Sequence, residues 1–434
     1  MPSHNWLFPA ALAVWLTADA VAAQAEGRDP LDGLDRISAE SLTDAVLVRN
    51  AGLDAMRAAL DAARARVVPA GALEDPELTY GFAPQTVDGF RTPGGDFRGP
   101  NQRIEISQGF PWPGKLDLRE KAARFEADAA GEDVEALRLE LAAAARTVFA
   151  EWHYAHRALA INAATQELVD ELRGSAESRY AAGIASQQDV LQAEVELERL
   201  KAERLQLTRE RIQIVARING LLNRPPQTPL PAPAGLPHAR PVPSFEVLRE
   251  AALAEHPELQ LMSNRIAANE ARAELAKKEF LPDFKVFTGY NSLWDEHVKR
   301  WIVGASINVP IGRDKRRAAL GEARANTRRL EAQLEDRRYT LLSALEQAHA
   351  AVAESVATVA LYRNELIPLS IENLDAARAA YSAGGGRFLD AIVAEQRKLE
   401  AELGLERARA DYLMRRAELQ RWTGDALPQV RLAE

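Results

Sequence analysis

Two histidines come nearest, among the residues of this sequence, to the spacing of a metal site. His153 and His156 stand three positions apart, which places both on one face of a helix. Two ligands make a weak site, because a catalytic zinc ion usually has three protein ligands. The other histidines are scattered, and the four methionines form no cluster that would favour a soft metal. The sequence therefore predicts no metal site and no cofactor.

Other catalytic chemistry finds equally little support. The sequence contains no nucleophile elbow, Walker loop or dinucleotide-binding glycine motif in a suitable context. The absence of cysteine excludes disulfides, thiolate ligands, a cysteine nucleophile and a lipidated cysteine. With 54 Lys and Arg against 63 Asp and Glu, the formal charge of −9 argues against a nucleic-acid partner. We therefore expect neither an enzyme nor a nucleic-acid-binding protein.

The N-terminus has the pattern of a secretory signal. Residues 6–17 form an apolar run that is too short to span a bilayer, and small-x-small sites follow at Ala20–Ala22 and Ala23–Ala25. A basic residue before Arg28 is missing, so a buried apolar N-terminal segment remains the alternative. No later segment has 18 consecutive apolar residues. We expect residues 1–25 to be a signal peptide and predict no transmembrane helix.

The rest of the chain consists mainly of two similar repeats. Ala45-Val46-Leu47 matches Ala251-Ala252-Leu253 at an offset of 206 residues, and Tyr180 and Gly183 match Tyr381 and Gly384 at 201. A steady offset near 200 indicates duplication. The predicted organisation is a first repeat at 26–222, a proline-rich linker at 223–243, a second repeat at 244–424 and a tail at 425–434. The density of proline predicts an extended, solvated linker.

Each repeat predicts the order helix, strand, loop, strand, very long helix, glycine-bearing turn and long helix. In the first repeat we expect helices over 41–68 and 116–182, and the second of these is about 100 Å long. The equivalent helix at 314–383 contains Pro368, which should kink or break it. Apolar residues recur at intervals of three and four, as in coiled coils. Examples are Val190, Leu191, Val195, Leu197, Leu200 and Leu205.

Four segments near 77–82, 103–110, 283–290 and 300–309 alternate apolar and other residues with the period of a strand. Alternation with aromatic residues near the ends is typical of outer-membrane barrels, although two hairpins on a soluble domain would also fit. Four strands cannot close a barrel, so a membrane location demands several chains. The polar loops 83–102 and 291–299 should then face the cell exterior. The expected membrane-facing residues are Leu78, Tyr80, Phe82, Ile104, Ile106, Phe110, Phe284, Val286, Tyr290, Trp301, Val303 and Ile307.

Glycines mark the turn between the two long helices of each repeat. Gly183 and Gly384, Gly385 and Gly386 can take positive φ angles and so end the long helices. Ser186 is expected to cap the returning helix, and the helix dipole favours Asp189 in its first turn. For Asp189 this structural role is the alternative to a functional one.

This duplicated plan resembles the TolC-type outer-membrane factors of tripartite efflux pumps over about residues 41–424. The resemblance is most specific in the turn segments 179–194 and 381–390, and segment 110–116 is similar to the heavy-metal efflux branch. It implies a mainly α fold with a small β part. Three chains would form a 12-stranded outer-membrane β-barrel, continued by a periplasmic α-helical coiled-coil barrel. The implied role is a passive export duct, with metal cations as one candidate cargo.

The resemblance also implies partners and an entrance. The partners are two further copies of the chain, outer-membrane lipid, a periplasmic adaptor and an inner-membrane pump, often of the resistance-nodulation-division type. Tyr381 and Asp390 match entrance residues of the family, Arg387 is displaced by one position, and Asp189 lies on the other turn. The tip and adaptor contacts would include Tyr180, Gly183, Ser186, Gly384, Gly385 and Gly386.

A second hypothesis is a soluble periplasmic coiled-coil interaction protein, such as an adaptor with a helical hairpin. An adaptor would carry one hairpin flanked by compact β domains. This sequence has two hairpins, with alternating strands at their far ends. The two hypotheses place the chain in the outer membrane of a Gram-negative bacterium, extending into the periplasm, or free in the periplasm.

Overall fold

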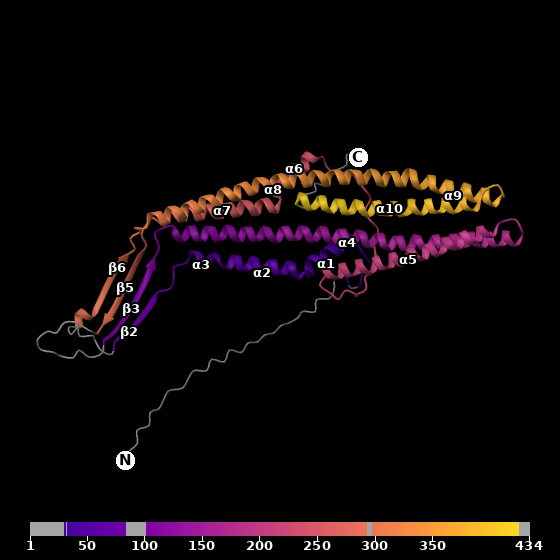
Figure 1. The fold of residues 1–434 in the computed structure, drawn as a ribbon. Helices are drawn as coiled ribbons and strands as arrows, with labels where there is room; N and C mark the ends of the chain where they lie inside the picture. The colour runs from indigo at the N-terminus through magenta and orange to yellow at the C-terminus, as the bar shows by residue number, and fades with distance from the viewer. Residues whose placement is uncertain (1–29, 32, 84–100, 293–296, 425–434) are drawn as a thin grey trace, which may run out of the picture.

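A computed structural model describes residues 30–31, 33–83, 101–292 and 297–424. Its helices lie side by side along one axis and form a long body, which bends at one end into a small sheet (Figure 1). Helix α4 (Lys115–Ala181) has 67 residues, so it extends for about 100 Å along this body. The expected signal peptide at 1–25, the tail at 425–434 and most of the loop 83–102 lie outside the described residues.

The order of elements is repeated, as the sequence predicts. The first copy contains α1 (Ala39–Arg49), α2 (Ala51–Ala65), α3 (Val67–Gly71), β2 (Glu77–Ala83), β3 (Asn101–Phe110), α4 and α5 (Gln187–Leu221). The second contains α6 (Phe245–Glu255), α7 (Pro257–Lys278), β5 (Phe284–Asn291), η1 (His297–Arg300), β6 (Trp301–Ile307), α8 (Arg313–Leu361), η2 (Tyr362–Leu366), α9 (Ile367–Ser382) and α10 (Phe388–Thr423).

The second long helix is interrupted where Pro368 predicts it. Helix α8 passes into the π-helical turn η2, and α9 begins one residue before Pro368. Proline removes one backbone donor and its ring clashes with the preceding turn, so the wider turn accommodates it without ending the helix. A Cβ at Gly404 of α10 would overlap the Tyr362 ring, so this glycine makes room for the widened turn.

The expected continuous helix over 41–68 is wrong, because the chain forms three shorter helices there. Asn50 ends α1 and caps α2, its side-chain oxygen accepting from Leu53 N–H at 3.2 Å. Its side-chain amide donates to Leu221 O at 3.0 Å. The break is therefore fixed by a contact with the end of α5, which the local sequence does not reveal.

The prediction of an extended, solvated linker is also wrong in part. Residues of β4 (Ala232–Pro233) pair in parallel with β1 (Arg36–Ile37). Pro233 and Leu236 are buried. The Asn219 side chain donates to Pro226 O and Thr228 O, both at 2.9 Å. These contacts pack the linker against the helical body, where Leu236 joins the apolar core of α1, α4 and α5.

The sheet has four antiparallel strands in the order β2-β3-β5-β6. Each repeat contributes one hairpin, and β3 pairs with β5 to join them. Within the described part of the chain, β2 and β6 each pair on one side only. One protomer therefore presents two open sheet edges.

Candidate functional site

One face of the sheet is mostly apolar. The register aligns Leu78 with Ile106 and Tyr80 with Ile104, and Ile104 with Tyr290. Residues directly opposite one another share a face, so the alternating residues of all four strands combine into one surface. Its large members are mostly exposed, and a patch of this kind in a single chain marks a contact with lipid or protein. The large apolar members of the face are Leu78, Tyr80, Phe82, Ile104, Ile106, Phe110, Phe284, Val286, Tyr290, Trp301, Val303 and Ile307, and the same face also contains Gln102, Gln108, Thr288 and Ala305.

The opposite face is polar or small. Its members include Glu77, Thr79, Arg103, Glu105, Ser107, Lys285, Gly289, Gly304 and Ser306, together with Phe287 and Ile302. Lys285 Nζ lies 3.1 Å from Glu77 Oε2 across this face. A sheet with one apolar and one polar face suits a wall between hydrocarbon and water.

Aromatic pairs stand at both ends of the sheet. Trp112 stacks on Phe284 at the helix-proximal end, with ring centroids 5.6 Å apart. Tyr290 meets Trp301 edge-on at the far end, at 5.4 Å. Phe284 and Tyr290 lie six residues apart on β5, so the aromatic pairs are separated by about 20 Å, somewhat less than the apolar band of about 25 Å in outer-membrane barrels.

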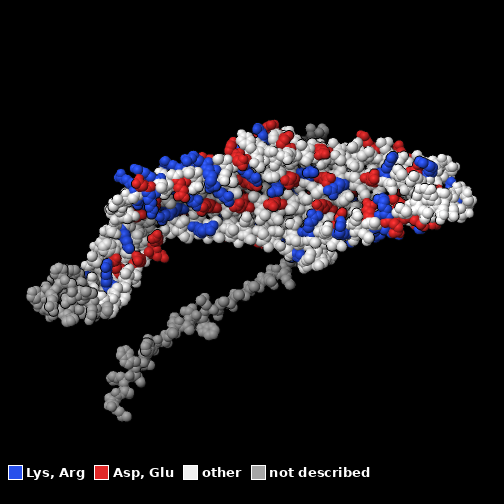
Figure 2. Space-filling view, in the orientation of Figure 1, with Lys and Arg blue, Asp and Glu red and all other residues white. Residues whose placement is uncertain are grey.

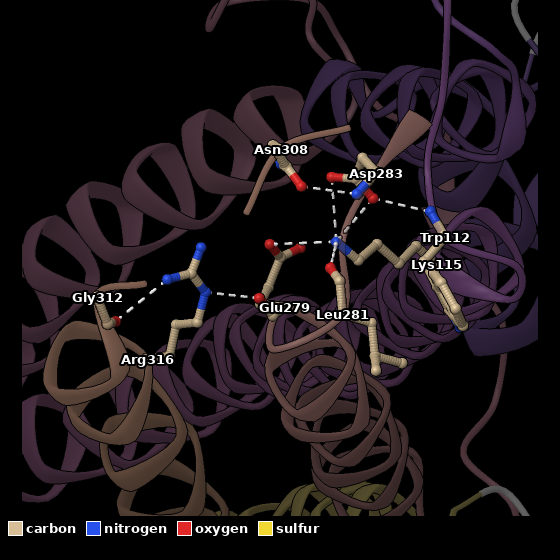
Figure 3. Close-up of polar contacts among 8 residues, drawn as sticks. All are labelled: Trp112, Lys115, Glu279, Leu281, Asp283, Asn308, Gly312 and Arg316. Carbon is tan, nitrogen blue, oxygen red and sulfur yellow. Dashed lines mark hydrogen bonds and ion pairs between the residues drawn. The ribbon is translucent and has the colours of Figure 1, made fainter. Parts of the chain in front are cut away.

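A buried lysine fastens the sheet to the helices, and the sequence analysis missed its role. Lys115 begins α4 and is 1% exposed. Its Nζ lies 2.9 Å from Asp283 Oδ1 and 3.4 Å from Glu279 Oε2, at the other repeat's helix-to-strand connection (Figure 3). Asp283 also accepts from Trp112 N–H at 2.8 Å. These bonds hold the two repeats together where the sheet meets the helices.

Two further contacts stiffen this junction. Asn308 accepts from Asp283 N–H at 2.7 Å, and Arg316 Nε donates to Glu279 O at 2.6 Å (Figure 3). Gly114 has φ +81°, and Lys278 occupies the space that a Cβ would need. The sequence signal was present in the Pro-Gly-Lys triplet 113–115, but its partners lie about 165 residues away.

Helix α5 has two apolar stripes on opposite sides. The buried stripe contains Ala193, Leu197, Leu200, Leu207, Ile214 and Ile218. The second contains Leu191, Val195, Leu205 and Ile212, and Val195 and Leu205 are 70% and 74% exposed. The coiled-coil pattern is therefore confirmed, but only one stripe is covered within the chain. A helix that is apolar on two sides belongs between two neighbours.

The two tip turns are built alike. Gly183 has φ 72° and donates to Tyr180 O, while Gly384 has φ 81° and donates to Tyr381 O. Each turn therefore has one glycine with the expected positive φ, and Gly385 and Gly386 do not have a positive φ. Position 386 favours glycine for a different reason, because a Cβ there would lie 2.9 Å from the Ala380 Cβ.

Tyr381 lies inside the tip and joins its two turns. It is 5% exposed, and its ring meets Phe388 edge-on at 5.3 Å. The Arg179 guanidinium lies 4.7 Å from the ring centroid and donates to Ser382 O. Burial, and then the charge of Asp189, raises the pKa of Tyr381. The contacts of Arg179 and Phe388 were not foreseen from the sequence, and they bring Tyr381 near Asp189.

Arg387 and Asp390 form their own exposed pair. Arg387 Nη2 and Nε donate to the two carboxylate oxygens of Asp390 at 2.8 and 3.2 Å. The hydrogen bond from Arg387 holds the pKa of Asp390 below its ordinary value. Ser186 occupies the N-cap position of α5, but the expected cap is wrong, because its hydroxyl donates to Asp189 at 2.9 Å instead. The proposed entrance residues thus fall into one buried cluster and two exposed pairs.

Farther along α10, Glu395 is 1% exposed and its carboxylate oxygens make no hydrogen bond to a described residue. Burial raises its pKa, while Lys398, 3.9 Å away, acts in the opposite direction. A group whose pKa is raised by folding stabilises the fold below its unfolded pKa, and this contribution is lost as the pH rises through the folded value.

We therefore expect Glu395→Gln to stabilise the protein at pH 8 and to have little effect on its stability at pH 4. Urea unfolding at the two pH values measures the difference. Glu400→Gln, an exposed change on the same helix, should show no such pH dependence. An equal gain at both pH values would mean that Glu395 does not titrate as its burial requires.

The histidine pair of α4 offers no ligand cluster. His153 is buried 4.0 Å from Glu406, and burial lowers its pKa to about 4, so the ring is neutral at pH 7. His156 packs against Trp152. In the described ranges, no group of three or more His, Cys, Asp or Glu side chains is placed to hold a metal ion. None of the described helices has a stretch long and apolar enough to cross a bilayer.

Solved structures share this fold. The outer-membrane channel OprN is 21% identical, with a TM-score of 0.76 and 89% of each chain covered. VceC, an outer membrane protein from Vibrio cholerae, is 19% identical, with a TM-score of 0.74, covering 89% of this chain and 96% of its own. CusC is 16% identical, with a TM-score of 0.76, covering 89% and 91%. A comparison with curated proteins gave no match.

The family comparison covers most of the sequence. The family model described as outer membrane efflux protein matches residues 42–224 and 248–425. These two matches follow the two copies of the fold and leave most of the linker between them. The matched residues make up well over half of the chain, so this protein belongs to the outer membrane efflux protein family.

Proposed function

We propose that this chain is one protomer of a homotrimeric outer-membrane duct in a tripartite efflux pump. The observation that carries the proposal is the sheet, which has one exposed apolar face, one polar face and two open edges. Open edges are not tolerated in lipid, because their backbone groups would lack hydrogen bonds. Edge-to-edge pairing of three four-stranded sheets gives a closed barrel of twelve strands, with the polar faces lining the lumen.

The helices support the same assembly. The exposed stripe of α5 needs a partner, and the opposite flank of the body exposes Tyr339, Leu361 and Leu369 on α8 and α9. Pairing α5 of one protomer with the α8 and α9 flank of the next would cover both surfaces. The long helices would then enclose a periplasmic tunnel below the barrel.

The tip is the proposed docking surface for a periplasmic adaptor, which links the duct to an inner-membrane pump of the resistance-nodulation-division type. Tyr180, Ile184 and Leu389 are exposed there, beside the exposed pairs Arg387–Asp390 and Ser186–Asp189. Metal cations are the cargo to test first, because segment 110–116 resembles the heavy-metal branch. The duct itself is passive and needs neither a catalytic site nor a cofactor.

Labelling of single cysteines tests the location and orientation of the chain, which has no natural cysteine. Val298→Cys lies in the exposed connection between β5 and β6, at the end of the sheet away from the helices. It should react with a membrane-impermeant maleimide in intact cells. Ile184→Cys, exposed at the tip, is the matched control and should react only after permeabilisation. Equal protection of both sites, with release of the protein by osmotic shock, would favour the soluble adaptor-like alternative.

A second experiment tests the trimer. Val195→Glu with Leu205→Glu places charges on the exposed stripe of α5 without touching the buried one. We expect the trimer to dissociate in mild detergent while far-ultraviolet circular dichroism stays unchanged. Ala58→Glu with Ala62→Glu adds the same charge to the exposed surface of α2, away from this stripe, and should leave a trimer. Mass photometry measures the stoichiometry, and a stable trimer in the stripe variant would contradict this interface.

A further inference from the structure

The start of α8 carries an excess of positive charge that the fold does not use. Four of its first five residues are basic, Arg313, Lys315, Arg316 and Arg317, although the whole chain has a formal charge of −9. Basic residues in the first turn oppose the helix dipole, so the helix gains no stability from them. Figure 2 shows Lys and Arg gathered at this end of the helical body, beside the bend to the sheet.

Of these four side chains, Arg316 alone bonds to another described element of the chain. Arg316 donates to Glu279 O at 2.6 Å and to Gly312 O at 3.1 Å. Arg317 lies 3.4 Å from Asp314, and both are exposed to solvent. Arg313 and Lys315 are exposed and make no ion pair with a described residue. We call Arg313, Lys315 and Arg317 the basic collar.

The equivalent position of the first repeat behaves differently. Helix α4 also begins with a lysine beside the sheet, but Lys115 is buried in ion pairs with Asp283 and Glu279. Each first turn also contains one aspartate, Asp117 in α4 and Asp314 in α8. Of the two helices that leave the sheet, α8 alone begins with a solvent-exposed run of basic residues. Buried ion pairs explain why α4 begins with Lys115. No such contact in the described part of the chain explains the three residues of the collar.

Exposed apolar residues lead directly into the collar. Val309 and Ile311 follow β6 and are 67% and 83% exposed. Ile311 N–H donates to Val309 O and Arg313 N–H donates to Ile311 O, both at 2.8 Å, so this segment has a defined backbone. Exposed apolar residues are thus present up to four residues past the strand, and positive charge follows them along the chain.

We propose that the basic collar binds the headgroups of anionic phospholipids in the leaflet nearest the helices. The proposal rests on the membrane location of the sheet in the proposed function. Val309 and Ile311 would then lie among acyl chains and the collar at the level of the phosphates. This order of apolar and basic residues matches the order of a bilayer from its interior outward, and basic clusters next to membrane segments attract anionic lipid. The exposed apolar residues Val309 and Ile311 beside the collar favour a lipid over a free phosphate ion.

Native mass spectrometry of the detergent-solubilised full chain tests this with phosphatidylglycerol as the probe. A basic side chain near an anionic lipid surface contributes a factor of about five in affinity. Because Arg317 is already paired, we expect Arg313→Gln, Lys315→Gln and Arg317→Gln together to weaken binding by about 10- to 100-fold at low salt. The difference should shrink at high salt, and phosphatidylcholine should bind both proteins alike. Arg316 is retained because it holds the junction.

The control neutralises Arg328, Arg329 and Arg338, exposed residues of the same helix farther from the sheet. Unchanged phosphatidylglycerol binding in the collar variant, or an equal loss in the control, would overturn the proposal. Displacement of the lipid by millimolar inorganic phosphate would show a simple anion site, which also overturns it. Oligomer mass and bilayer conductance are measured on the same samples. If the parent protein forms neither an oligomer nor a pore, the proposed function fails first, and the collar proposal fails with it.

Discussion

Replacing Lys115 by methionine is expected to loosen the joint between the sheet and the helices and to cost about 2–4 kcal/mol of stability. Lys115 is fully buried, while Asp283 and Glu279 are partly exposed, so water offsets some of the loss. Removing the lysine leaves two carboxylates facing each other without a cation. Methionine keeps most of the side-chain volume, so the effect is chiefly electrostatic. Urea unfolding of the detergent-solubilised protein measures it.

Two further variants show whether the ion pair is the cause. Lys121→Met removes an exposed lysine six residues along α4 and should change the stability little. Lys115→Met with Asp283→Asn removes both charges, so it should recover part of the loss and reveal coupling in a double-mutant cycle. Equal stability of Lys115→Met and Lys121→Met would contradict the structural role assigned to the junction.

The elements themselves were predictable because their signals are local. The predicted helix 116–182 and the observed α4 differ by one residue at each end. The period of two in the strands was enough to predict a single apolar face, which the register confirms. Pro368, Gly183 and Gly384 act on their own backbone, so their effects could be predicted from residue type.

The failures have a common physical cause. Asn50 breaks a helix because its amide reaches Leu221 O, 171 residues away. Tyr381 is buried because Arg179 approaches from the other turn, whose backbone lies about 200 residues earlier. Lys115 finds its carboxylates in the other repeat. In each case the role of the side chain depends on a partner that is distant in the sequence. A local sequence pattern identifies the residue but not this partner, so the role could not be predicted.

The other large effect is expected from substitutions at the proposed entrance. Arg387→Ala with Asp390→Ala should raise single-channel conductance several-fold in planar bilayers and weaken block by Mg²⁺. The physical reason is that threefold symmetry would bring three of these exposed pairs around one opening, where side-chain bulk narrows the path and carboxylates attract cations. Arg57→Ala with Asp54→Ala removes an exposed pair of the same spacing on α2 and should change neither property.

The bidentate contact makes the single variants more informative than the double one. Each Asp390 is only partly neutralised by its own exposed Arg387, so Arg387→Ala should free three carboxylates and strengthen Mg²⁺ block. Asp390→Ala should instead expose three guanidinium groups, which repel divalent cations and shift selectivity toward anions. Opposite shifts from the two variants would support a charged ring at the entrance. If both single variants and the double variant conduct and are blocked like the parent, the constriction lies elsewhere, and Asp390 serves only the N-terminus of α10.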